Sequence, residues 1–143
     1  MADLFTFRSG LRLSRPVPVA SGVVIQIGEL CKLSGCKATP VVTTTDNLTF
    51  IGPAAQAHGA LDGSGTVNID VPHPLAVYEY TLNATTDIAI LDALQINSKS
   101  KVKKSATTQI ARADESKLQA TTISLRFNLP AVTSGIRFVG DQS

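Results

Sequence analysis

The chain has 143 residues, of which 43% are hydrophobic and 17% charged, and its net charge is +2. This composition is typical of one folded domain and excludes an intrinsically disordered chain. The low net charge and the aromatic content of 5%, with no Trp, argue against specific binding of nucleic acid, which relies on strongly basic surfaces and stacking rings.

No apolar stretch reaches the roughly 20 residues that a membrane-spanning helix needs, so we expect no membrane partner. Residues 1–20 contain three arginines and two prolines where a signal peptide would have an apolar segment. We therefore expect that the protein is made in a reducing cytoplasm and is kept there unless cell lysis releases it.

Residues 1–18 are predicted to form an extended N-terminal arm, and residues 19–143 to form a single all-β domain. Pro16 and Pro18 keep the end of the arm out of a helix. Exposed Phe and Leu side chains at a terminus are an aggregation liability unless they pack. The arm packs either on its own domain or on a partner, where apolar anchors and Arg carry interface energy. The candidate contacts are Phe5, Phe7, Arg8, Leu11 and Arg12.

The rest of the chain has runs of Val, Ile and Thr that are separated by turn residues about every 8 to 12 positions. This spacing predicts a small β-barrel or β-sandwich. The first predicted strand covers residues 23–33, with a possible bulge at Gly28. A turn at Ser34 and Gly35 would lead into a strand over residues 36–43 and complete a hairpin.

The only two cysteines, Cys31 and Cys36, belong to this hairpin. They either face each other within disulfide reach or remain reduced thiols, and the expected compartment favours the reduced pair. The two histidines, His58 and His73, have no zinc-site spacing to the cysteines. We expect no metal and no cofactor.

Further strands are predicted downstream, and two of them alternate clearly between apolar and polar residues. In the segment 66–71 the apolar residues face inward and Asp70 faces outward, and in the segment 121–129 Ile123, Leu125, Phe127 and Leu129 share the inner face. Residues 54–65 are predicted to form a surface loop, and residues 87–96 suit either a strand or a short helix. The other predicted strands are residues 48–51, 75–82, 101–105, 107–113 and 136–139.

Four lysines cluster around the predicted strand 101–105, namely Lys99, Lys101, Lys103 and Lys104. We favour an edge strand on which lysines discourage pairing with other chains. The alternative is a basic stripe that binds nucleic acid or an acidic partner.

We find no catalytic constellation and expect that the protein is not an enzyme. The adjacent acids Asp114 and Glu115 fall in a predicted loop, where such pairs are usually solvated. Ser64 and His58 lack the strand-to-helix elbow that exposes a serine nucleophile.

The order of several segments carries a family resemblance. Ile-Gly-Glu-Leu-Cys-Lys-Leu at 27–33 is followed by a Ser-Gly turn and Lys-Ala-Thr-Pro, and then by the segments 65–71, 77–80, 84–89, 101–105, 110–113 and 121–129. Over about residues 17–129 this order resembles the capsid decoration (cement) proteins of tailed phages. Leu91-Asp92 stands where that family has Gly-Asp.

The resemblance implies a viral structural protein that is made in the host cytoplasm and binds the outer surface of the phage head. Its partner would be the major capsid protein, and it would assemble there as a homotrimer and stabilise the shell. Two alternatives remain: another virion or tail structural subunit, or a trimeric all-β ligand-binding module or hydrolase.

Overall fold

The computed structural model describes residues 5–10, 12–72, 75–105 and 109–128, and for residues 5–8, 44 and 48 it describes the backbone alone. The chain is nearly all β, as predicted, and its described part contains no α-helix. The elements are β1 (Phe5–Gly10), β2 (Ser14–Val19), β3 (Leu30–Ser34), β4 (Lys37–Pro40), the 3-10 helix η1 (Thr44–Leu48), β5 (Phe50–Pro53), β6 (Gly65–Asp70), β7 (Ala76–Ile88), β8 (Ala93–Ser98), β9 (Lys101–Lys104), β10 (Ala111–Ala113) and β11 (Lys117–Phe127).

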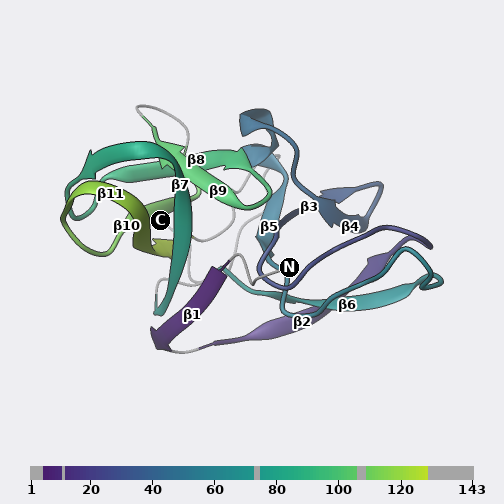
Figure 1. The fold of residues 1–143 in the computed structure, drawn as a ribbon. Helices are drawn as coiled ribbons and strands as arrows, with labels where there is room; N and C mark the ends of the chain where they lie inside the picture. The colour runs from purple at the N-terminus through teal and green to yellow at the C-terminus, as the bar shows by residue number, and fades with distance from the viewer. Residues whose placement is uncertain (1–4, 11, 73–74, 106–108, 129–143) are drawn as a thin grey trace, which may run out of the picture.

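Five strands close into a barrel in the order β7, β11, β10, β8 and β9. Its neighbouring strands are antiparallel, except that β9 closes the barrel by pairing in parallel with β7, Thr81 opposite Lys101 and Leu82 opposite Val102. Figure 1 shows the barrel on one side of the molecule, and on the other side the two-stranded sheet of β2 and β6 and the three-stranded sheet of β4, β3 and β5.

Phe127 lies at the centre of the larger core. Its ring centroid is 5.4 Å from that of Phe50, 5.3 Å from that of Tyr78 and 5.8 Å from that of Tyr80. Such contacts contribute beyond the burial of area. The predicted inner face of the last strand is confirmed for Ile123, Leu125 and Phe127, which are all buried, while Leu129 lies outside the described residues.

A second, smaller core lies between the remaining sheets. The sheet β4–β3–β5 and the pair β2–β6 supply most of its side chains. The tyrosine hydroxyl of Tyr80 connects this region to the barrel, since it donates a hydrogen bond to the carbonyl oxygen of Gly28 at 2.6 Å. The members of the smaller core are Val17, Val19, Ile25, Cys31, Ala38, Ile51, Ala54, Val67 and Ile69.

The N-terminal strands run along both parts of the molecule. β1 pairs antiparallel with β7, from Phe5 opposite Tyr80 to Gly10 opposite Ala76. β2 pairs antiparallel with β6, from Ser14 opposite Asp70 to Val19 opposite Gly65. Among the described residues its sheet has no further strand, so Pro16 and Pro18, which lack an N–H, interrupt no strand pairing on the other side of β2. Residues 5–10 and 14–19 therefore lie beside the consecutive strands β6 and β7 and connect the barrel to the smaller core.

Several predicted elements differ from the structure. The long strand over 23–33 is wrong before Leu30, because residues 23–29 form turns with a positive φ of 92° at Gly28 and a single bridge from Ile25 to His58. The edge-strand interpretation of the lysine segment is also wrong, since β9 pairs on both sides. The segment 87–96 contains the end of β7, a turn and β8.

Local polar contacts explain η1, which the sequence did not predict. The Asp46 carboxylate accepts hydrogen bonds from the backbone N–H groups of Val42 at 2.6 Å and Thr43 at 3.1 Å, which fixes the entry to this short helix. The predicted strand 136–139 lies outside the described residues. No helix in the described ranges has the length and apolar character to cross a membrane.

Candidate functional site

The predicted partner contacts lie on two segments near the start of the chain. Phe5, Phe7 and Arg8 belong to β1, whose backbone pairs with β7, and Arg8 falls in a register shift of this pairing. Their side chains, and the whole of Leu11, lie outside what the structure describes. Arg12 is the one candidate whose side-chain contacts are described, and they are within the chain.

Arg12 forms an ion pair with a carboxylate that the sequence pattern placed on the outside of its strand. The Nε of Arg12 donates to Oδ2 of Asp70 at 2.9 Å, and the Tyr78 hydroxyl donates to the same oxygen at 2.7 Å. The outward placement of Asp70 is wrong: this residue is fully buried, because Arg12 and Tyr78 cover that face of β6. The other oxygen, Oδ1, has no hydrogen-bond partner among the described residues.

The cluster of Arg12, Asp70 and Tyr78 joins β6 and β7 to the connection between β1 and β2. Burial, and then the hydrogen bond to Asp70, raise the pKa of Tyr78 far above its usual value, so the hydroxyl remains a donor. The Arg12 side chain is 38% exposed, whereas that of Asp70 is not exposed at all. The cluster thus neutralises a buried charge with a cation from the connection between β1 and β2.

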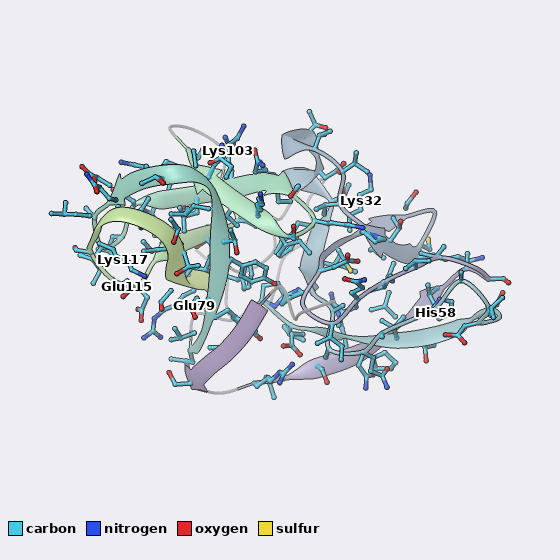
Figure 2. All side chains as sticks on the ribbon, viewed as in Figure 1. Lys32, His58, Glu79, Lys103, Glu115 and Lys117 are labelled. Carbon is cyan, nitrogen blue, oxygen red and sulfur yellow. The ribbon has the colours of Figure 1, made fainter. Side chains whose placement is uncertain are left out.

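The lysines near β9 divide into two groups. Lys99 forms an ion pair with the buried Glu29 at 3.3 Å, and Lys104 forms one with Asp92 at 3.3 Å. Lys101 on β9 is exposed, and Lys103, which Figure 2 labels, is partly exposed. Lys99 and Lys104 thus have carboxylate partners within the chain, although their own side chains are 52% and 46% exposed.

The outer surface of β7 and β11 carries a network of polar side chains. The Thr122 hydroxyl donates to Oε2 of Glu79 at 3.1 Å, and Nζ of Lys117 lies 3.3 Å from the same hydroxyl. Glu115 accepts a hydrogen bond from the backbone N–H of Ser124 at 2.9 Å. Figure 2 shows Glu79, Glu115 and Lys117 on this side of the barrel.

The adjacent acids Asp114 and Glu115 lie in the loop between β10 and β11, as predicted, but they are less exposed to solvent than the sequence predicted. Asp114 pairs with Arg126 at 2.6 Å and, like Glu115, is partly buried, and the strand β11 begins at Lys117 inside the predicted loop. In the described part of the chain, no three or more His, Cys, Asp or Glu side chains are grouped so that they could hold a metal ion.

One end of the barrel exposes apolar side chains. Ile90, Leu91 and Leu118 are 55%, 64% and 81% exposed. The turn after β7 is fixed by Arg112, whose Nη1 donates to the carbonyl oxygen of Leu91 at 2.9 Å, and Leu91 has a positive φ of 74°. We call Ile90, Leu91 and Leu118 the barrel-end surface, since Leu118 follows Lys117, which pairs with Ile88 at the end of β7 just before Ile90 and Leu91.

The barrel-end surface and the N-terminal strand lie at different places along β7. β1 pairs with the first part of β7, residues 76–80, and the exposed turn follows its last residue, Ile88. The sequence did not single out this surface, because residues 87–96 suited a strand or a helix equally and no periodicity marks a turn with a non-glycine residue at positive φ.

The two cysteines occupy different environments. Cys36 is exposed in the two-residue turn between β3 and β4, where Gly35 and Cys36 have φ values of 58° and 65°, as a type I′ hairpin turn requires. Cys31 is buried in the smaller core, where burial and then the Glu29 charge raise the pKa of its thiol to about 12. Both are free thiols.

We expect one thiol per native chain to react with a thiol reagent at pH 8. Cys36 is accessible, whereas Cys31 is buried and stays protonated at this pH. Titration of native and denatured protein should give one and two reactive thiols, and Cys36→Ser should remove the fast reaction. Comparable reaction rates for both thiols in the native protein would contradict this assignment.

No protein-family model matches the sequence, and comparison with curated proteins gives no match. Among solved structures, the chain is similar to the N base of the head fiber gp8.5 of bacteriophage phi29. The TM-score is 0.46 and the sequence identity 13%, and the match covers 81% of this chain and 95% of that chain. A similarity of this extent assigns no function.

Proposed function

We propose that this protein is a structural protein of a tailed-phage virion that binds the outer surface of the head and stabilises it. The observation that carries the proposal is the ordered resemblance to cement proteins. Its segments overlap strands of the fold in chain order: residues 27–33 end in β3, residues 37–40 are β4, and the later segments overlap β6, β7, β9, β10 and β11. The partner we propose is the major capsid protein, and the proposed assembly on the head is a trimer.

Stabilisation of a shell by such a protein needs no chemical step. Many copies that each bury a modest area between neighbouring capsid subunits act together, because a contact at one site holds the next site in place. A barrel with closed hydrogen bonding suits this task, since it can bear load without exposing free strand edges.

The barrel-end surface is the part of the described chain that we propose contacts the major capsid protein. Ile90 and Leu91 lie on the turn after β7, which is held by backbone hydrogen bonds and by Arg112, and Leu118 lies at the start of β11. The backbone of this surface therefore loses little conformational freedom on binding. The N-terminal arm, residues 1–18, is less suitable for this test, because its removal would delete both Arg12 and the strand β1 that pairs with β7.

The experiment is co-sedimentation of the purified protein with capsids assembled from the major capsid protein of its own source. We expect saturable binding at a fixed ratio of copies, and a ratio of three per site would support the trimer. Absence of binding to both immature and expanded shells would refute the proposed function.

The same assay tests the barrel-end surface. Replacing Ile90 and Leu118 together with Ser should weaken binding about tenfold, which corresponds to about 1.4 kcal/mol for the loss of apolar anchors. The matched control is Leu61→Ser, since Leu61 is fully exposed in the loop between β5 and β6. Equal binding by the double variant and the control would exclude this surface from the interface.

A further inference from the structure

The predicted surface loop 54–65, which leads from β5 into the first residue of β6, is fastened to residues 20–25. The backbone N–H of Ile25 donates to the carbonyl oxygen of His58 at 2.8 Å, and the N–H of His58 donates back at 2.9 Å. The N–H of Gly22 donates to the carbonyl oxygen of Asp62 at 2.9 Å. The segment predicted as a plain surface loop thus has a defined attachment, and His58 lies at its centre.

Both ring nitrogens of His58 face carbonyl oxygens. Nδ1 lies 2.6 Å from the carbonyl oxygen of Val23, and Nε2 lies 2.9 Å from that of Gly63. A carbonyl oxygen only accepts hydrogen bonds, and a neutral imidazole has only one N–H to donate. Both ring contacts can therefore be hydrogen bonds only when the ring is the doubly protonated imidazolium.

The surroundings of the ring favour this charged form. The hydrogen bonds to Val23 and Gly63 raise the pKa of His58 above 6.5, burial opposes them, and the Asp62 carboxylate adds to the increase. Asp62 is itself held in place, since its Oδ2 accepts a hydrogen bond from the N–H of Gly59 at 2.7 Å. Residues 20–25 contribute no titratable side chain.

We propose that His58 is a proton-dependent latch that fastens the 54–65 loop to residues 20–25. The imidazolium donates to the backbone on both sides of the attachment, to Val23 and within the loop to Gly63. Loss of the proton turns one of these contacts into an approach of two lone pairs and loosens the loop. The proposal is independent of capsid binding, because His58 lies across the molecule from the barrel, as Figure 2 shows.

The direction of the pH effect follows from linkage. Because the pKa of His58 is higher in the folded than in the unfolded chain, the contribution of the latch to stability is complete below pH 6.5. It is lost as the pH rises through the pKa of the folded chain. The equilibrium for opening of the loop should shift about tenfold for each pH unit by which the folded pKa exceeds the unfolded one.

The test is an NMR titration of the imidazole together with native-state hydrogen exchange at the amides of Gly22, Ile25 and His58. We expect a His58 pKa above 6.5 and two protonated ring nitrogens at pH 6. After correction for the intrinsic exchange rate, protection of these three amides should fall as the pH rises. His58→Gln should remove this pH dependence, and the control His73→Gln, which changes the only other histidine, should retain it.

Two results would overturn the proposal. One is a single protonated ring nitrogen at pH 6, and the other is the same pH dependence of amide protection in the native protein and in His58→Gln. If His58→Gln does not fold, the ring titration of the unchanged protein decides the question, since it needs no variant.

Discussion

Replacing Arg12 with Ala is expected to destabilise the protein by about 3 kcal/mol or more, whereas Asp70→Asn should cost about 1 to 2 kcal/mol. The two residues form one ion pair at 2.9 Å but differ in exposure, 38% for the Arg12 side chain and zero for that of Asp70. Removal of Arg12 leaves a buried carboxylate without its cation. With Asn at position 70, water can solvate the partly exposed guanidinium of Arg12, and the Asn amide oxygen can still accept the hydrogen bond from the Tyr78 hydroxyl.

Chemical denaturation of the two variants at neutral pH tests this asymmetry. The double variant, Arg12→Ala with Asp70→Asn, should be more stable than the sum of the two single losses implies. The stability changes of substitutions within one hydrogen-bonded network are not additive. Equal losses for the two single variants, or a neutral effect of Arg12→Ala, would show that Asp70 does not depend on this cation.

Gly52→Ala is the second substitution with a large expected effect, again about 3 kcal/mol or more. Gly52 lies on β5 opposite Cys31 and has a φ of 136°. A Cβ at this position would lie 2.0 Å from the carbonyl oxygen of Asp70 and 3.2 Å from Cγ2 of Ile69. Since the first contact is with backbone, β5 and β6 would have to separate.

Gly63→Ala is the matched control for this substitution. A Cβ at Gly63 would have no heavy atom within 4 Å, so we expect a change of less than about 1 kcal/mol. Thermal and chemical denaturation of both variants measure the difference. Similar stabilities for Gly52→Ala and Gly63→Ala would mean that the close approach at Gly52 is not required by the fold.

Periodicity predicted the strands that have one face on a core. Ile123, Leu125 and Phe127 alternate with polar residues because only one side of β11 is buried. The hairpin was also predictable from the Ser-Gly segment, but its turn lies at Gly35 and Cys36, one residue later than predicted, because Ser34 still pairs with Lys37. These features depend on local sequence alone, so the sequence is enough to predict them.

The features that the sequence missed depend on contacts between distant residues. Asp70 continues the polar side of β6 in the pattern, but Arg12, 58 positions earlier, and Tyr78 bury it. β9 looks like a lysine-rich edge, but its parallel pairing with β7 has no local signature. The barrel-end surface depends on the unusual backbone at Leu91, which no propensity predicts.

For the N-terminal segment, the sequence predicts extended backbone correctly but does not predict which strand it pairs with. Its prolines indicate extended backbone, and residues 5–10 and 14–19 are strands. Whether such a strand pairs with its own domain or with another molecule depends on a free sheet edge elsewhere in the fold. β6 and the first part of β7 provide that edge within the chain.

Electron cryomicroscopy of capsids saturated with the purified protein tests the proposed function most directly. We expect density of the size of this chain on the outer surface of the head, repeated at one class of symmetry site, with the barrel end toward the shell. Density inside the shell or on the tail, or capsids without added density, would contradict a role in head decoration.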